Sequence, residues 1–202
     1  MASHLPAASQ FAVYGPTFLD VVMGPLDGPP VPGREAWVEG ALMCAGGAAN
    51  QAIALARLGA PVCLHSRVGV DQMGVFVDEM LAREGVDTSS CERVGDQNVT
   101  VSLSFDGDRA MTTRGTTALP RLGGDAPACL LADVRGISAN SEIVSSWREC
   151  GTWVLADTAW DEARAWDEAD LESLRLADVC TPNEEEALAY ARTESVEDAA
   201  RW

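Results

Sequence analysis

The chain contains no lysine, and all fourteen of its basic residues are arginines. This absence excludes enzymes that form a Schiff base or that use a lysine as general base, because both need the lysine amine. It also excludes a GxxxxGK phosphate-binding loop, whose lysine contacts the β and γ phosphates of a nucleotide. Any chemistry carried by these 202 residues must therefore use other side chains.

Histidine and paired cysteine are also scarce. The two histidines are His4 and His65, so a catalytic triad or a metal cage built on histidine would depend on His65 alone. The six cysteines are scattered and form no CxxC pair, and the first ten residues show neither the basic nor the apolar region of a secretion signal. We therefore expect reduced thiols in apolar packing, no zinc site and a cytoplasmic protein.

Long apolar runs and positive charge are the remaining deficits. Runs such as 153–156 fall far short of the roughly 20 residues that a membrane span needs. The formal net charge is -17, and residues 157–202 hold fourteen acidic residues against four arginines, a pattern typical of solvated helix faces. Because binding to nucleic acid or anionic lipid begins with neutralising negative charge, we expect neither a nucleic acid nor a membrane as partner.

The rest of the sequence predicts an α/β fold. Apolar residues make up 47% of the chain, enough for a packed core. Helices are expected at 48–58, 71–85, 141–149, 169–176 and from 183 onward, and strands at 11–14, 19–22, 62–65, 99–105, 109–113, 134–138, 152–157 and 178–180. This alternation favours a mostly parallel sheet with helices on both faces.

Two segments do not follow the alternation of strand and helix. Residues 17–44 include a stretch rich in proline and glycine, and residues 96–113 include a strictly alternating strand followed by the turn signal Asp106-Gly107. We expect both segments to form a small β lid on a domain spanning 11–202, after a flexible tail at 1–10. Exposed edges of such a lid would favour a homodimer.

Gly46 and Gly47 come just before an alanine-rich helix, with Asn50 one turn inside it. Glycine lets a ligand approach the backbone closely, and the Asn50 amide can donate and accept hydrogen bonds at once, which suits vicinal hydroxyls. Taken by itself, the pattern is more often only a tight helix entry.

Polar residues also follow several of the expected strands. Asp20, Asp157 and Asn183, like the two glycines, each follow a predicted strand or open a helix. Ligands of open α/β sheets bind beyond the carboxyl ends of the strands, so we predict that these residues converge there.

Four motifs in order give the chain a family resemblance. They are Asp20 after the first strand, AGGAANQAIALARLGA at 45–60, VGVDQMG at 68–74 with EGVDTS at 84–89, and TPNEEEA at 181–187. Together they cover nearly the whole chain, and the chain resembles the PfkB-type carbohydrate kinases, the ribokinase-like family. The resemblance implies a ribokinase-like fold and a sugar or nucleoside as the small-molecule substrate.

The resemblance also implies roles for single residues. Asp20 and Asn50 would bind sugar hydroxyls, and Gly46 and Gly47 would present their backbone to the sugar. ATP and Mg²⁺ would be the cofactors. Asn183 and Glu186 would lie near the ATP phosphates, with Glu186 orienting the hydrated Mg²⁺. The spacing of the residues alone favours Asn183 as a helix cap after Pro182 and Glu186 as a solvated acid, and only the family resemblance favours the ATP site.

The chain departs from the family pattern in two places. No GAGD segment occurs, although its aspartate is the family's catalytic base and its amides form the anion hole. At the family's DxN position this chain has Asp157-Thr158-Ala159. We therefore expect a C-terminally incomplete fold, with no catalytic residue in this chain and the base beyond residue 202.

Three hypotheses follow for the function. In the first, the full-length protein phosphorylates a sugar or nucleoside hydroxyl with ATP, and this chain carries the substrate-binding part. In the second, the chain is a non-catalytic protein that binds a sugar or nucleoside or dimerises through the lid. The third, an unrelated nucleotide-binding module, is weakened by the absence of GxGxxG and of lysine. The sequence leaves the identity of the sugar open.

Overall fold

A computed structural model describes residues 10–158, 166 and 168–201, so nearly all of the expected flexible tail lies outside the described residues. The chain divides into two compact units, each of which is described by itself. The first unit comprises residues 1–15, 60–62 and 121–202, and the second comprises residues 16–59 and 63–120. Among the described residues, no helix has both the length and the apolar character needed to cross a bilayer.

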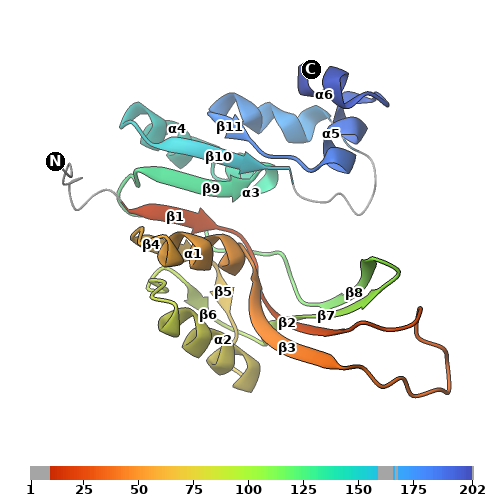
Figure 1. The fold of residues 1–202 in the computed structure, drawn as a ribbon. Helices are drawn as coiled ribbons and strands as arrows, with labels where there is room; N and C mark the ends of the chain where they lie inside the picture. Colours follow the sequence, from red (N-terminus) through yellow and green to blue (C-terminus); the bar gives the residue numbers. More distant parts are fainter. Residues whose placement is uncertain (1–9, 159–165, 167, 202) are drawn as a thin grey trace. The chain divides into compact units, whose positions relative to one another are not determined.

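The first unit is built on a parallel sheet (Figure 1). Its strands are β1 (Phe11–Tyr14), β9 (Cys129–Asp133), β10 (Trp153–Asp157) and β11 (Val179–Cys180), in the order β11-β10-β9-β1. The sheet order continues with β4 (Val62–His65), where the chain passes into the second unit. Val13, Leu130 and Val154 are fully buried, as expected for the centre of a parallel sheet.

The helical segments of the first unit follow its strands. They are α3 (Val134–Ala139), α4 (Ser141–Glu149), the 3₁₀ helix η1 (Glu168–Leu176), α5 (Glu184–Ala191) and α6 (Val196–Arg201). Helix α3 packs on β9, β10 and η1, and α5 packs on α6. The expected α/β alternation with a mostly parallel sheet is therefore confirmed.

The strand predicted at 134–138 is wrong, because this segment is helix α3. Asp133 ends β9 and caps the helix, since its Oδ1 accepts a hydrogen bond from the Gly136 amide at 2.5 Å. Val134 and Ile137 are both fully buried, and their spacing of three residues fits one face of a helix. The apolar residues before Asp133 form the strand instead.

The second unit contains a four-stranded mixed sheet in the order β3-β2-β7-β8. Its strands are β2 (Thr17–Gly24), β3 (Gly40–Gly47), β7 (Asn98–Phe105) and β8 (Asp108–Arg114). Strand β2 pairs with β3 antiparallel and with β7 parallel, while β7 and β8 form a hairpin at Asp106-Gly107. The two segments expected to form a lid thus pair in one sheet; whether that sheet covers a ligand stays a prediction.

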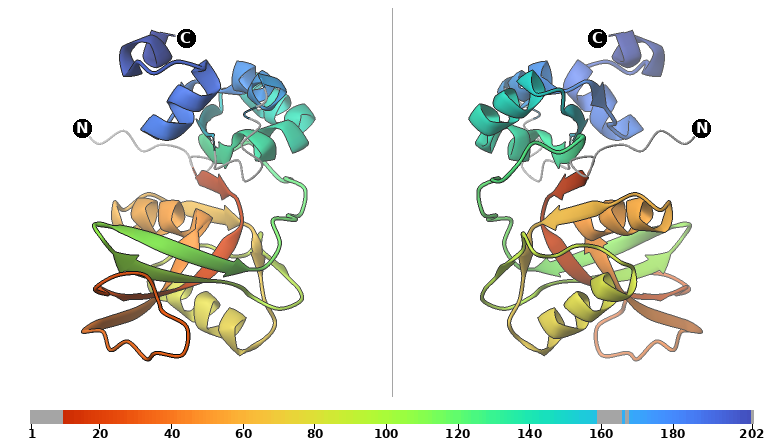
Figure 2. Two further views of the ribbon diagram at one scale, coloured as in Figure 1. Left: turned by 90° about the vertical axis from the view of Figure 1, so that its right-hand side faces the viewer. Right: turned by 90° about the vertical axis from the view of Figure 1, so that its left-hand side faces the viewer.

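Helices α1 (Ala48–Arg57) and α2 (Gln72–Arg83) both contact β2 and β3. Figure 2 shows the two helices, in orange and yellow, from two further sides. Helix α1 buries Ala49 and Ala52 completely, which allows its backbone to approach the sheet closely. Asp71 caps α2, because its Oδ1 accepts a hydrogen bond from the Gly74 amide at 2.8 Å. Both helices begin where the sequence predicted them.

The VGVDQMG loop is held by the buried side chain of Gln97. Its Oε1 accepts from the Gly69 amide at 2.9 Å, and its Nε2 donates to the Thr17 carbonyl at 2.9 Å. A Cβ at Gly69 would lie 2.3 Å from the backbone nitrogen of Gln97, so only glycine fits there. The loop is therefore tied to the beginnings of β2 and β7.

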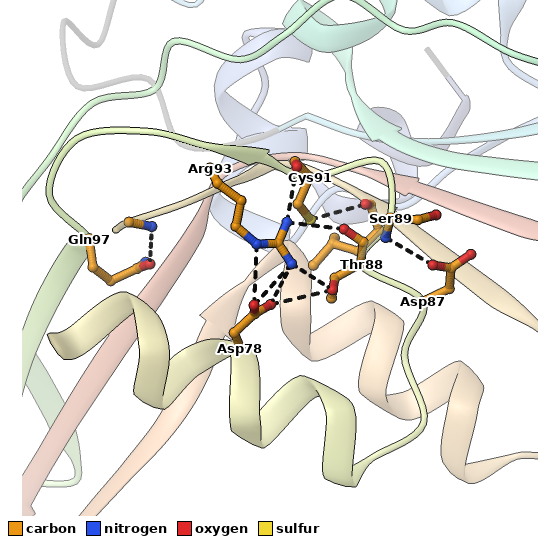
Figure 3. A network of polar contacts seen from close by, with 9 residues as sticks. Asp78, Asp87, Thr88, Ser89, Cys91, Arg93 and Gln97 are labelled. Atoms are coloured by element: carbon orange, nitrogen blue, oxygen red, sulfur yellow. Dashed lines mark hydrogen bonds and ion pairs between the residues drawn. The ribbon is translucent and has the colours of Figure 1, made fainter. Parts of the chain in front are cut away.

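The EGVDTS segment takes part in a polar network on the same unit (Figure 3). The Arg93 guanidinium, on β6 (Glu92–Arg93), contacts the Asp78 carboxylate of α2 at 2.8 Å and the Thr88 hydroxyl at 2.9 Å. The buried Cys91 thiol donates to the Leu64 carbonyl at 3.2 Å, and burial raises its pKa to about 12. This motif thus links α2 to the strands beside it and has a structural role.

Candidate substrate and nucleotide sites

Strand pairing in the second unit places Asp20 between two neighbouring strands. Asp20 pairs with Cys44 on β3 and with Thr100 on β7, so the three side chains share one face of the sheet. The carboxylate lies against Gly46, where a Cβ would come within 1.9 Å of Oδ2. Glycine at position 46 is therefore required by the position of the Asp20 side chain.

Two opposing effects set the charge state of Asp20. Partial burial raises its pKa above the usual value, and a hydrogen bond from the Thr100 side chain lowers it, with burial the larger effect. The pKa of the neighbouring Cys44 thiol is raised by burial and by the negative charge of Asp20. A half-buried carboxylate of this kind can accept hydrogen bonds from the hydroxyls of a ligand.

Gly47 joins this strand to helix α1 in a conformation that suits glycine. Its φ is 64°, and a Cβ would lie 2.3 Å from the Pro16 carbonyl oxygen and 2.7 Å from the Phe18 ring. Asn50 lies on the first turn of α1 and is exposed. The structure therefore brings Asp20, Gly46 and Gly47 together, and places Asn50 on the helix that follows them. We call these four residues the Asp20 corner.

Asn183 and Glu186 meet in the first unit as a reciprocal helix cap. The Asn183 Oδ1 accepts a hydrogen bond from the backbone N–H of Glu186 at 2.9 Å. In return, the Glu186 Oε2 accepts one from the backbone N–H of Asn183 at 3.0 Å. The same Oε2 accepts a hydrogen bond from the Thr158 hydroxyl at 2.7 Å. The capping interpretation of Asn183 is confirmed, whereas the interpretation of Glu186 as a solvated acid is wrong, because its side chain is buried.

These residues lie just beyond the carboxyl ends of two parallel strands. Asp157 ends β10 and Cys180 ends β11, and Thr158 and Asn183 follow them in the chain. A cavity of about 660 Å³ opens here, and Thr158, Cys180 and Asn183 are among its lining residues. This is the position at which open α/β sheets bind ligands.

The same place bears on the expected Mg²⁺. No group of three or more His, Cys, Asp or Glu side chains within the described part of the chain is arranged to hold a metal ion. Mg²⁺ in nucleotide sites is usually held by one or two carboxylates together with phosphates and water. Glu186 supplies a single carboxylate, and its protein hydrogen bonds go to Oε2. It therefore fits a site in which phosphates and water provide the other ligands of Mg²⁺.

Sequence reasoning missed two residues that the structure places at these sites. Thr100 belongs to the alternating strand predicted at 99–105, but its contact with Asp20 depends on strand register across 80 residues of chain. Thr158 stands next to Asp157 at the family's DxN position, and its bond to Glu186 spans 28 residues. The signal that could have identified them is a hydroxyl side chain within a predicted strand (Thr100) or directly after one (Thr158).

Part of the sequence matches known proteins. Residues 38–118 match the pfkB family carbohydrate kinase profile. A segment of 56 residues is 46% identical to 2-dehydro-3-deoxygluconokinase of Bacillus subtilis (strain 168), covering 28% of this chain and 17% of that protein.

Solved structures match over almost the whole chain. A ribokinase-like protein of Agrobacterium tumefaciens has a TM-score of 0.80 at 20% identity over 95% of this chain. The fructokinase of Halothermothrix orenii has a TM-score of 0.78 at 18% identity, also over 95% of this chain. The ATP-bound fructokinase of Xylella fastidiosa has a TM-score of 0.72 at 22% identity over 96% of this chain.

The chain is shorter than these relatives. It covers 64% of the Agrobacterium protein, 74% of the Halothermothrix fructokinase and 67% of the Xylella fructokinase. At identities of 18–22%, these structural matches show the fold alone. The family profile matches the part of the chain that includes Gly46, Gly47 and Asn50. Residues 38–118 thus match the pfkB family carbohydrate kinase profile, and the chain has the same fold as the ribokinase and fructokinase structures to which it is similar.

Proposed function

We propose that this chain supplies the sugar-binding part of an ATP-dependent carbohydrate kinase. The observation that carries the proposal is the Asp20 carboxylate, which lies against Gly46 near the beginning of β2 and the end of β3. A carboxylate held beside glycine backbone offers hydrogen-bond acceptors to adjacent hydroxyls. The substrate would be a sugar, a sugar acid or a nucleoside, and the Bacillus relative's name adds 2-dehydro-3-deoxygluconate to the compounds to be tested.

On the nucleotide side, we propose that Asn183 and Glu186 lie near the phosphates of ATP. Bound Mg²⁺ would neutralise phosphate charge during phosphoryl transfer. Glu186 is held by the Thr158 hydroxyl and by the cap of α5, so its carboxylate has one orientation. A fixed carboxylate can orient the water molecules around a hydrated cation.

Ligand binding by this chain tests the proposal. Isothermal titration calorimetry with D-ribose, D-fructose, adenosine and 2-dehydro-3-deoxygluconate should give saturable binding for at least one compound. The titration is repeated with Asp20→Asn, and Asp125→Asn at an exposed loop position provides the matched control. If none of the four binds, or if the two variants lose affinity equally, the sugar-binding assignment fails.

Phosphoryl transfer is a separate expectation. The 202 residues contain no GAGD segment, so the purified chain should not phosphorylate the sugar that it binds when Mg-ATP is supplied. A coupled assay of ADP release detects such activity. Turnover above background would show that a base exists within this chain.

A second candidate function, dimerisation, follows from the opposite face of the same sheet. Val21, Met43 and Val101 lie side by side on β2, β3 and β7, and the strand alternation turns them away from Asp20. Met43 is 53% exposed and Val101 38% exposed. We propose that this apolar row packs on a second copy of the chain, because exposed apolar patches on sheets mark protein interfaces.

A further inference from the structure

We propose that Thr100 and Thr113 are positioning residues for Asp20, forming a directed chain in which Thr113 donates a hydrogen bond to Thr100 and Thr100 donates one to Asp20. The kind of ligand that Asp20 would bind rests on the proposed function, but the series of hydrogen bonds between the three side chains does not. It would make the carboxylate a rigid acceptor with one orientation toward a bound hydroxyl.

Strand register brings the three side chains into one row. Asp20 on β2 pairs with Thr100 on β7, and Thr100 pairs with Thr113 on β8. Directly paired residues of neighbouring strands project from the same face of a sheet. The two threonine hydroxyl oxygens lie 3.0 Å apart, and Thr100 is buried. The row therefore crosses three strands without a break.

The direction of the chain follows from counting protons. An ionised carboxylate only accepts hydrogen bonds, so the single hydroxyl proton of Thr100 is used toward Asp20. Thr100 then has only lone pairs left for its other neighbour, and Thr113 must donate. Protonation of Asp20 would remove this constraint, because a carboxylic acid can donate as well.

The opposite side of the carboxylate is also closed. A Cβ at Gly46 would meet Oδ2 at 1.9 Å and Oδ1 at 2.6 Å, so the carboxylate lies against Gly46 with Oδ2 nearest to it. Held by β3 on one side and by Thr100 on the other, Asp20 has little freedom to turn. A site whose groups are fixed before binding loses less entropy when the ligand arrives.

The test measures the Asp20 side chain in the free protein. NMR titration of the ¹³C-labelled aspartate carboxyl gives its midpoint in wild type and in Thr100→Val, Thr100→Ser and Thr113→Val. Valine keeps the branched shape of threonine and loses the hydroxyl, while serine keeps the hydroxyl. We expect a higher midpoint in Thr100→Val, a smaller rise in Thr113→Val and near wild-type behaviour in Thr100→Ser.

Each result decides part of the proposal. An unchanged midpoint in Thr100→Val would overturn it, and an unchanged midpoint in Thr113→Val would remove Thr113 from the chain. Asp20→Asn identifies the Asp20 resonance, and circular dichroism confirms that each variant is folded. A variant that does not fold is replaced by Thr100→Cys, in which a weak thiol donor stands in for the hydroxyl and should give an intermediate midpoint.

A binding arm separates this inference from the proposed function. For whichever of the four compounds binds, Thr100→Val should weaken affinity about tenfold and Thr100→Ser less than threefold, as expected for loss of one hydrogen bond to a charged group. If Asp20→Asn leaves affinity unchanged while the NMR midpoints shift as expected, the sugar assignment fails and the positioning chain stands. If Asp20→Asn weakens binding but Thr100→Val does not, only the positioning inference fails.

Discussion

The charged side chain of Asp20 lies against Gly46, a residue that has no side chain. A methyl group at position 46 would overlap the carboxylate, with its carbon 1.9 Å from Oδ2. The side chain or the strand would have to move, and the acceptor geometry of the Asp20 corner would change with it. This is a physical reason for glycine at the position that the family resemblance assigns to the sugar.

Gly46→Ala should therefore weaken sugar binding at least about tenfold, through displacement of Asp20. Gly28→Ala is the matched control, because a Cβ there meets nothing within 4 Å. Calorimetry measures the affinity and thermal denaturation checks the fold. Equal affinity in the two variants would contradict this role of Gly46.

The pKa of Asp20 also predicts a conflict between binding and stability. Because burial raises this pKa in the folded chain, the ionised carboxylate destabilises the fold at neutral pH relative to a neutral side chain. Asp20→Asn should therefore unfold at a higher temperature than wild type at pH 7. The difference should shrink as the pH falls through the raised pKa toward 3.8, the ordinary pKa of an aspartate, because the acid becomes neutral. A lower unfolding temperature for Asp20→Asn at pH 7 would refute this prediction.

At the scale of elements, buried Gln97 joins parts of the second unit that are far apart in sequence. Its amide group bonds the Gly69 amide and the Thr17 carbonyl, and it is 1% exposed. Removing the amide would leave two buried backbone groups without their partner. Each such group costs about 1–3 kcal/mol of stability.

Gln97→Leu should accordingly lower the free energy of unfolding by about 2–4 kcal/mol. Urea denaturation followed by circular dichroism measures this loss. Gln72→Leu, at an exposed position on α2, makes the same chemical change and should alter the free energy by less than about 0.5 kcal/mol. Similar effects of the two substitutions would show that the Gln97 bonds are not important for the fold.

Elements with a strong local signal were predictable from sequence. Helix α1 has the helical spacing of small apolar residues, and the β7–β8 hairpin has strict alternation with Asp106-Gly107 at its turn. Strand β3 was not predicted because its residues are mostly glycine and alanine, which have low strand propensity. The segment 134–138 was misassigned because a short apolar run fits a strand and a buried helix face equally well.

The candidate sites were only half predictable. Asp20, Gly46, Asn183 and Glu186 were found because their motifs occur in the order of a known family. Thr100 and Thr158 were not found, because their hydrogen bonds depend on strand register and on contacts between distant segments. The local sequence does not indicate which strands lie next to each other in the sheet.

At the scale of the whole molecule, the apolar row on the second unit predicts an oligomer. Met43→Glu places a charge in the row formed with Val21 and Val101, and should convert a dimer to a monomer in sedimentation equilibrium. Met73→Glu, on the exposed side of α2, is the control and should not change the mass. A wild-type chain that is monomeric at millimolar concentration would contradict the prediction.

The charge of the whole chain bears on its partners. Three consecutive glutamates, Glu184, Glu185 and Glu186, occupy the first turn of α5, where negative charge stabilises a helix N-terminus. Part of the acidic excess thus has a local structural role. The exclusion of nucleic acid and membrane partners and the cytoplasmic location stay predictions.

The central claim is that the Asp20 corner binds a sugar, and the most direct test compares the sugar affinities of wild type and Asp20→Asn. Calorimetry is carried out at pH 7 with the best-binding member of the panel of sugars and nucleosides. We expect at least about tenfold weaker binding for Asp20→Asn, with an unchanged fold. Equal affinity in wild type and Asp20→Asn would show that the sugar is bound elsewhere and not at the Asp20 corner.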